Sequence, residues 1–491
     1  MYTNRLRKQL PRALVTIAPV TLRPFDLAVI IAYLAGITWF GARFRSRQHS
    51  LRDYFLGGQA APWWAIALSI VSAETSTLTI IGTPPLAYAG SYVFLQVVFG
   101  YLLARIVISA VFLPQYFKGQ MFTAYELMQR RFGSRVRKVT AAIFLVTRSL
   151  AEGVRVFAVS IVVSVILHTG SVESILAIIA LTLFYTFEGG MTAVIWTDVI
   201  QMGMYVFGAA ISFFVLLHKI PGGFGHVIDV AVPAGKLRVF DFHWSWTLPY
   251  TFWAGVIGGT FLTAASHGTD QLVVQRLLSA KSERQSRLAL LSSWGVIFVQ
   301  FSMFLTIGLL LWVYRNGEKF AADELDRLYP SFIWNSLPTG IAGLAMAAII
   351  AAAMANLSAA LNSLASATVV DFYQPFTHSS RKPEHYLKVS RISTVFWGAV
   401  LAVIGVVASH WGSVLESGLS IASVTLGILL GVFLLGVLTK RPGENAAIAG
   451  VIAGAVTMLV VKFETTIPFT WWVLIGSTVT FGVGYLTSCV A

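Results

Sequence analysis

The chain contains 491 residues, of which 56% are hydrophobic and only 11% are charged, and its mean hydropathy is +0.75. Soluble globular proteins contain about 45–50% apolar and about 25% charged residues, so this composition excludes a soluble protein. The single cysteine, Cys489, excludes an intrachain disulfide. The net charge of +14 requires either anionic partners or an uneven distribution of basic residues between the two sides of a membrane.

Thirteen apolar stretches reach the roughly 20 residues that a helix needs to cross a lipid bilayer. They follow a basic tail of residues 1–24. In chain order they lie near 25–44, 62–82, 92–114, 139–167, 171–187, 191–217, 250–272, 287–314, 337–370, 389–409, 412–438, 444–462 and 468–488. We therefore predict an all-α polytopic membrane protein of about 13 transmembrane helices, embedded in the lipid bilayer and without a separate soluble domain.

Lysine and arginine residues are distributed unevenly between alternating loops. The loops on one side hold 20 of them, and the loops on the other side hold 7. The positive-inside rule assigns the first set to the cytoplasm. This predicts an outside N-terminus and a cytoplasmic C-terminus, although the basic tail alone favours the reverse. The charge is thus a topology signal, and neither a nucleic-acid partner nor an obligatory protein partner is indicated. The lack of a cleavable signal or a glycosylation site in a loop favours a bacterial inner membrane.

The stretch from Ser69 to Gly90 carries groups that a helix in lipid avoids. It holds the carboxylate of Glu74, several hydroxyl side chains and the pair Pro84-Pro85. A charged group in lipid is costly, hydroxyls compete for backbone bonds and proline removes a donor. Because irregular backbone at membrane depth occurs only where it is buried or lines a cavity, we predict an interruption between Glu74 and Thr79, with free carbonyls that face a cation.

A second polar interruption follows downstream, in "GGTFLTAASHGTDQ" from Gly258 to Gln271. Two broken spans in corresponding halves are typical of inverted-repeat transporters, which bind solute near the membrane midplane. We predict repeats over 62–217 and 250–438, with an extra helix at 25–44 and two at 444–488. The alternative is that both segments are glycine-rich contacts between helices.

Six segments, in chain order, resemble motifs of the sodium:solute symporter family. They are "DYFLGGQAAPWWAIALSIVSAETS" from Asp53, "TAYELMQRRFG" from Thr123, "GGMTAVIWTDVIQ" from Gly189, "DQLVVQRLLSAKS" from Asp270, "LSAALNSLASATVVDFY" from Leu357 and "GILLGVFLLGVLTKRPGENAAIAG" from Gly427. The resemblance implies a LeuT-type fold of two inverted five-helix repeats. It also implies a transporter, not an enzyme, that couples inward sodium movement to uptake of a small polar solute by alternating access, without an organic cofactor.

The resemblance also implies a sodium site between the break in the first repeat and the helix near 337–370. The carbonyls that match the family pattern are those of Ser72, Thr75 and Ala352, and the two hydroxyl positions match Ala355 and Asn356. Alanine offers no side-chain oxygen, so this chain departs from the pattern, although asparagine offers an amide oxygen to a hard cation.

Two carboxylates are candidates for the missing ion ligand. Glu74 precedes Thr75 and is expected to supply an oxygen and a charge. Some family members are described as having a second sodium near an aspartate, which matches Asp198 here, with Ser358 as its partner. Either carboxylate is also a candidate proton carrier, because burial without charge partners favours the protonated form. Proton coupling is therefore the alternative to sodium coupling.

The candidate solute contacts flank the two breaks. They are Thr79 in the first repeat and Thr263, Ser266 and His267 in the second. A structural hydrogen bond between helices is an equally good explanation for His267.

A cluster of charges lies within two of the predicted spans. Arg148, Glu152 and Arg155 share one helical face, because they are spaced at i, i+4 and i+7. We favour a structural network with Arg105 or an acid of another helix, and the alternative is that Arg155 meets an anionic solute or a gating carboxylate.

Two further classes of function stay open. One is a membrane-embedded solute sensor, since this type of module sometimes serves signalling. The other is an intramembrane enzyme that uses Glu74, His267 and Asp198. Because the chain has no Walker A motif, no Cys/His cluster and no nucleophile elbow, ATP-driven transport and covalent catalysis lack support.

Overall fold

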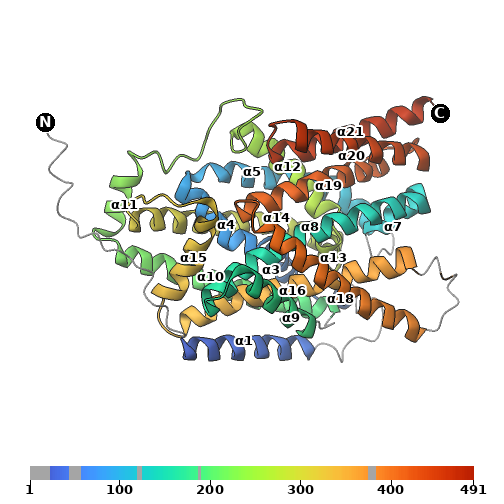
Figure 1. Ribbon diagram of the computed structural model, residues 1–491. Coiled ribbons are helices and arrows are strands. Elements are labelled where there is room, and N and C mark those ends of the chain that lie inside the picture. Colours follow the sequence, from blue (N-terminus) through green and yellow to red (C-terminus); the bar gives the residue numbers. More distant parts are fainter. Residues whose placement is uncertain are drawn as a thin grey trace.

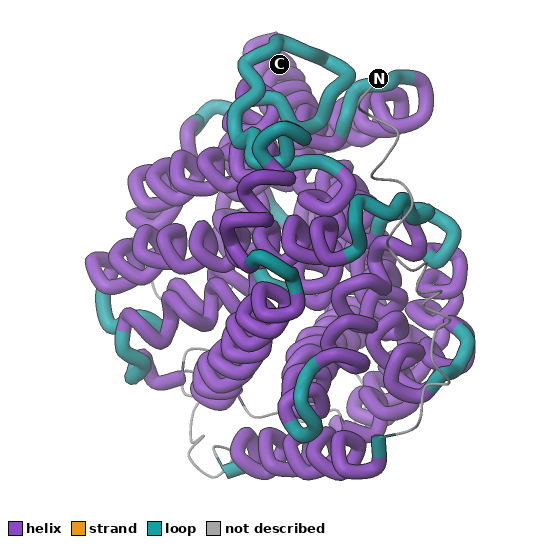
Figure 2. The backbone as a smooth tube through the Cα atoms, turned by 90° about the vertical axis from the view of Figure 1, so that its left-hand side faces the viewer, coloured by secondary structure: helices purple, strands orange, loops and turns teal. Residues whose placement is uncertain are grey.

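The computed structural model describes residues 23–43, 57–118, 124–185, 190–373, 377 and 383–490. Within these ranges every regular element is helical (Figure 2). The long helices form one bundle, in which α1 (Pro24–Ala42) lies along one side and α20 (Glu444–Glu464) and α21 (Phe469–Val490) lie along the opposite side (Figure 1). The predicted basic tail lies outside the described residues apart from Arg23 and Pro24.

The other elements follow in chain order. They are η2 (Gly57–Gln59), α3 (Trp63–Glu74), α4 (Thr77–Ala89), η3 (Tyr92–Phe94), α5 (Leu95–Val107), η4 (Ile108–Phe112), α6 (Leu113–Phe117), α7 (Ala124–Phe132), α8 (Ser134–Leu167), α9 (Ser171–Tyr185), α10 (Gly190–Lys219), α11 (Gly223–Ala231), α12 (Phe252–Gly268), α13 (Gln271–Leu278), α14 (Glu283–Tyr314), α15 (Ala322–Ser336), α16 (Ile341–Ala367), η5 (Thr368–Tyr373), α18 (Pro383–Ala408) and α19 (Val414–Leu438).

Ten helices in the described part of the chain are long and apolar enough to cross a membrane, or eleven if α3 and α4 form one bent span. The all-helical membrane architecture is therefore confirmed, but the predicted count of thirteen is not. The two remaining predicted stretches, 171–187 and 250–272, correspond to α9 and α12. These helices have 15 and 17 residues, which is shorter than a full apolar span.

The first predicted break is confirmed. Helix α3 ends at Glu74, α4 begins at Thr77, and the two helices meet at an angle of 67°. Within the described residues, no backbone N–H donates to the carbonyl oxygens of Ser72 or Thr75. The prolines at 84 and 85 lie buried inside α4, so they do not form the break. The break instead follows the cluster of hydroxyl residues that precedes α4.

The second break lies at the end of the predicted stretch. Helix α12 continues through Gly268, and α13 begins at Gln271. The side chain of Asp270 accepts a hydrogen bond from the backbone N–H of Leu272 at 2.8 Å and so caps α13. The preceding hydroxyl residues therefore lie on a continuous helix, one or two turns before the interruption.

The extra N-terminal helix is fixed to the second repeat by a buried carboxylate. Asp26 accepts hydrogen bonds from the backbone N–H groups of Gly340 and Gly343, at 2.7 and 2.8 Å, and pairs with Arg23 at 2.7 Å. The two backbone contacts satisfy N–H groups at the start of α16, where no preceding turn of the helix supplies carbonyl acceptors. Helix α1 thus supplies the N-terminal cap of α16.

Close helix packing predicts one clear effect of substitution. At Gly308 in α14, an added Cβ would overlap the carbonyl oxygen of Pro84, whereas at Gly295 on the same helix it would meet no atom within 4 Å. We expect Gly308→Ala to cost about 1–3 kcal/mol through overpacking and Gly295→Ala to be neutral or slightly stabilising. The melting temperatures of the two detergent-purified variants test this, and equal melting temperatures would contradict the packing.

Candidate functional site

A cavity of about 210 Å³ lies between the two breaks and is lined by residues of α3, α4, α8, α12, α13, α16 and α19. All four residues predicted to contact solute line it. They are Thr79, Thr263, Ser266 and His267. Several of the predicted charged or ion-site residues line the same cavity. They are Glu74, Arg148, Arg155 and Asn356. The structure therefore brings these residues to one cavity, while their individual roles in binding stay predictions.

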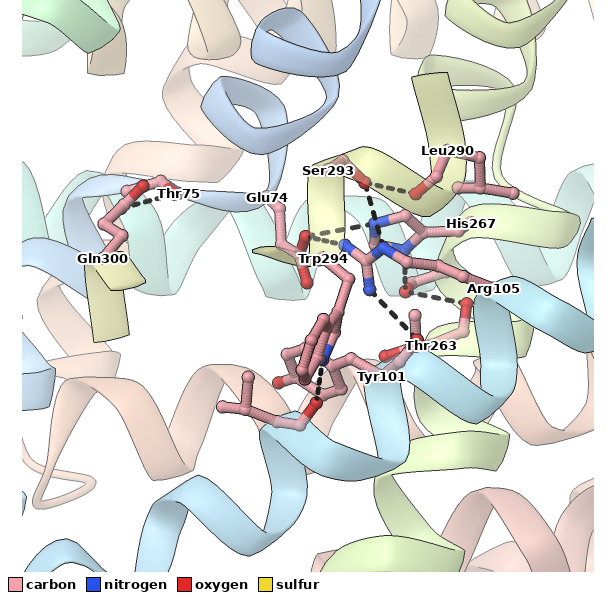
Figure 3. Close-up of polar contacts among 12 residues, drawn as sticks. Glu74, Thr75, Tyr101, Arg105, Thr263, His267, Leu290, Ser293, Trp294 and Gln300 are labelled. Carbon is pink, nitrogen blue, oxygen red and sulfur yellow. Dashed lines mark hydrogen bonds and ion pairs between the residues drawn. The ribbon is translucent and has the colours of Figure 1, made fainter. Parts of the chain in front are cut away.

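Glu74 forms an ion pair at the first break (Figure 3). Its Oε2 accepts a hydrogen bond from Arg105 Nη2 at 2.6 Å and lies 3.3 Å from Nε2 of His267. The other two nitrogens of Arg105 donate to Ser293 Oγ and to the carbonyl of Tyr101, at 3.0 and 3.2 Å. Arg105 is fully buried, and each of its three side-chain nitrogens donates a hydrogen bond inside the protein.

This geometry gives Glu74 a structural role as the counter-ion of Arg105. Glu74 already has Arg105 as a direct counter-ion, so its charge is compensated within the protein. Arg105 and Glu74 belong to different helices of the first repeat, and His267 belongs to the second repeat. The pair therefore connects α3, α5 and α12. A direct role of Glu74 in ion binding is left as a prediction.

The charges of α8 form the structural network that the sequence favoured. Glu152 Oε1 lies 3.0 Å from Arg148 Nη2 and 2.6 Å from Arg155 Nη1. Arg148 also reaches Asp270 Oδ2 at 3.6 Å, so the acid from another helix is Asp270. Glu152 is fully buried, whereas the side chain of Arg155 is 28% exposed. Because Arg155 also lines the cavity, its guanidinium is accessible to a ligand there.

A third ion pair was missed by the sequence analysis. Asp198 Oδ2 accepts hydrogen bonds from Ser69 Oγ at 2.6 Å and from Arg276 Nη2 at 2.8 Å. Arg276 was counted as a charge of a cytoplasmic loop, but it lies buried on the short helix α13. The sequence feature that could have indicated its burial is its position among apolar residues in "QLVVQRLL". The proposed sodium role of Asp198 remains untested, and its carboxylate already has a counter-ion.

The residues predicted to bind sodium occupy two places. Ser72 and Thr75 lie at the end of α3, where Thr75 Oγ1 accepts a hydrogen bond from Gln300 at 2.7 Å (Figure 3). The others lie on the continuous helix α16. They are Ala352, Ala355, Asn356 and Ser358. Asn356 also borders a second, smaller cavity beside the start of α4. The ligand assignment therefore stays a prediction.

Comparisons with known proteins show the family to which the chain is related. The model of the sodium:solute symporter family matches residues 54–454. The sodium/sialic acid symporter SiaT of Proteus mirabilis is 29% identical over 472 residues, which cover 94% of each chain. Human sodium-coupled monocarboxylate transporter 1 is 29% identical over 414 residues, which cover 83% of this chain and 67% of that protein.

A solved structure shares the fold. The outward-open, substrate-bound structure of a Na⁺-coupled sialic acid symporter has a TM-score of 0.81 and 28% identity, and the match covers 95% of this chain and 98% of that chain. These relatives are transporters and not enzymes, which confirms the expected class of protein. The match also confirms the fold class predicted from the sequence.

The Glu74–Arg105 pair predicts a charge-compensation effect on stability. Removing one partner of a buried ion pair typically costs 3–5 kcal/mol, because the other charge is left uncompensated. We expect Glu74→Gln and Arg105→Gln each to lower the yield and melting temperature of purified protein, and the double variant to recover much of the loss.

The same variants also test whether Glu74 takes part directly in sodium binding. Ala355→Ser should not rescue the folded yield of Glu74→Gln, because that change adds only a hydroxyl on α16. A well-folded Glu74→Gln variant with weakened sodium affinity, rescued by Ala355→Ser, would instead show that Glu74 serves the ion.

Proposed function

Because the chain belongs to the sodium:solute symporter family, we propose that it is a secondary transporter that couples inward sodium movement to the uptake of a small organic anion. The observation that carries the choice of an anion is Arg155. Its guanidinium is partly exposed and lines the central cavity. Transport proceeds by alternating access, with the breaks as the sites where the helices re-orient.

The charges around the breaks are balanced in the described part of the chain. Four arginines pair with four carboxylates. They are Arg105, Arg148, Arg155 and Arg276, with Glu74, Glu152, Asp198 and Asp270. A bound sodium ion therefore adds a positive charge to this balanced set. At about 4 Å and an effective dielectric constant near 20, one opposite charge is worth roughly 4 kcal/mol. An anionic solute supplies that charge.

The cavity also offers hydrogen-bonding groups for the rest of a small organic anion. Arginine binds carboxylates through paired hydrogen bonds, and the hydroxyls of Thr79, Thr263 and Ser266 line the same space. His267 provides a further polar group. The relatives named for sialic acid and for monocarboxylates act on organic acids, which supports a carboxylate as the solute.

We place the coupling ion between the first break and α16. The carbonyls of Ser72 and Thr75 receive no backbone hydrogen bond within the described residues, and sodium requires oxygen ligands of this kind. The carbonyl of Ala352 and the amide of Asn356 complete the set carried over from the family, in which Ala355 stands at a hydroxyl position and offers no side-chain oxygen. A second sodium between Asp198 and Ser358 is the less supported site, because Arg276 already neutralises the aspartate.

The protein is placed in the cell membrane as a multi-pass chain, with the N-terminus outside and the C-terminus in the cytoplasm. The orientation rests on the distribution of lysine and arginine between loops. The loop 374–382, with its cluster of basic residues, lies outside the described residues except for Thr377. A proton-coupled symporter is the second candidate, because His267 and Glu74 both line the cavity.

Purified protein in sealed proteoliposomes tests the coupling ion. We expect uptake of radiolabelled lactate, pyruvate or sialic acid to require an inward sodium gradient at constant pH, and to stop when an ionophore dissipates it. Uptake that follows the proton gradient and ignores sodium would refute sodium coupling. Turnover of a candidate solute by detergent-solubilised protein would instead indicate an enzyme.

A charge variant tests the solute class. Arg155→Gln should raise the KM for an anionic solute about tenfold to a hundredfold, because each decade corresponds to roughly 1.4 kcal/mol of binding free energy. Glu152 keeps Arg148 as a partner, so folding should persist. Arg287→Gln, which breaks an exposed ion pair with Glu283 on α14, is the matched control. An unchanged KM in a folded Arg155→Gln protein would rule out the proposed anion contact.

A further inference from the structure

A second cavity of about 10 Å³ lies where the start of α4 meets α8 and α16. Its polar lining comes from Ser76 and Thr77 on one side, from Glu152 and Arg155 on another, and from Asn356 on the third. A volume of this size holds a single water molecule or a single small ion. Ser76, Arg155 and Asn356 also line the central cavity, so the two cavities adjoin.

Two of the lining side chains carry buried oxygens without a partner. Neither Oε2 of Glu152 nor Oγ1 of Thr77 has a hydrogen-bond partner in the described structure. Glu152 is 0% exposed and Thr77 is 2% exposed. A buried polar atom left unpaired costs about 1–3 kcal/mol, and more if it is charged. Both unpaired atoms belong to residues that border the same small space, although they come from different helices.

We propose that this small cavity is a sodium site whose charged ligand is Glu152. Glu152 Oε2, Thr77 Oγ1 and the amide oxygen of Asn356 are its side-chain ligands, and all three are hard oxygen donors of the type that such cations take. The inference rests on the proposed sodium-coupled function and deepens it. The small cavity shares Asn356 with the family-matched ligand set and adds a carboxylate from α8.

An unsatisfied buried oxygen, and not a lack of counter-ions, distinguishes Glu152 from the other two carboxylates. Glu74 and Asp198 each have one arginine as a direct counter-ion, at 2.6 and 2.8 Å. Glu152 has two arginine contacts, both through Oε1. Among these three carboxylates, only Glu152 has an oxygen, Oε2, that is buried without a hydrogen-bond partner in the described structure. Its second oxygen therefore has no partner among the described residues.

The site also explains how ion and solute depend on each other. Arg155 binds Glu152 Oε1 and at the same time lines the central cavity. When an anionic solute engages Arg155, less of the Glu152 charge is compensated by that arginine and more is available to the cation. Binding of sodium and anion is then cooperative, and by linkage each ligand strengthens the other by the same factor.

Thr77→Val tests the site, because it removes the hydroxyl and keeps the shape. We expect Thr77→Val to raise the half-saturating sodium concentration about tenfold, both for ²²Na⁺ binding to purified full-length protein and for uptake. Thr77→Ser, which retains the hydroxyl, should recover most of that affinity. Thr83→Val is the matched control, since Thr83 is also buried on α4 with an unpaired hydroxyl but borders neither cavity.

Two further variants address the charge and the coupling. Glu152→Gln should weaken ²²Na⁺ binding more than Thr77→Val does, and Glu152→Asp, which keeps the charge, provides the measurement if the glutamine variant folds poorly. In the wild-type protein, saturating lactate, pyruvate or sialic acid, whichever is transported, should tighten ²²Na⁺ binding about tenfold. In Arg155→Gln this enhancement should disappear.

The outcomes separate the inference from the proposed function. If wild-type uptake requires sodium but Thr77→Val and the Glu152 variants keep wild-type sodium affinity, the small cavity holds only water and the inference is wrong. If wild-type protein neither binds ²²Na⁺ nor requires sodium for uptake, sodium coupling itself is wrong. An effect of Thr83→Val equal to that of Thr77→Val would show a general packing defect and would overturn the site.

Discussion

The structure depends on one constraint, which is that charges and backbone groups in the interior of a membrane protein have no water to pair with. The chain meets this constraint by direct pairing across helices. Glu74 has Arg105, Asp198 has Arg276, and Glu152 has two arginines of its own helix. The helical breaks are the places where this pairing is incomplete, and they are also where the cavities lie.

The ion pairs do more than neutralise charge, because they connect the two halves of the protein. Glu74 on α3 contacts His267 on α12, Asp198 on α10 contacts Arg276 on α13, and Arg148 on α8 contacts Asp270. Helices α12 and α13 flank the second break. Each contact therefore joins the first repeat to the region that must re-orient if access alternates. Contacts of this type can exchange partners without leaving a charge in lipid.

The sequence allowed much of the fold to be predicted, because lipid imposes local rules. Apolar length located the helices, and the hydroxyl cluster with Glu74 located the first break to within a few residues. Short or interrupted helices were harder. Helix α13 has only 8 residues, too few for periodicity to separate it from a loop, so buried Arg276 was counted as a loop charge. The small residues of the second stretch did not reveal that α12 continues to Gly268. Charge partners on different helices were beyond reach, because Asp198 and Arg276, for example, are 78 positions apart and no local pattern relates them.

The cap that α1 provides for α16 has a consequence for the order in which the protein is made. Asp26 and the two backbone groups it binds are separated by 314 and 317 positions. Helix α1 is synthesised first, yet its buried carboxylate gains these partners only after most of the chain has been inserted. Domains and helices that emerge early normally fold early, but this helix must wait beside an unfinished bundle. Packing of the first helix against the second repeat is therefore a late step of assembly, because it requires the start of α16.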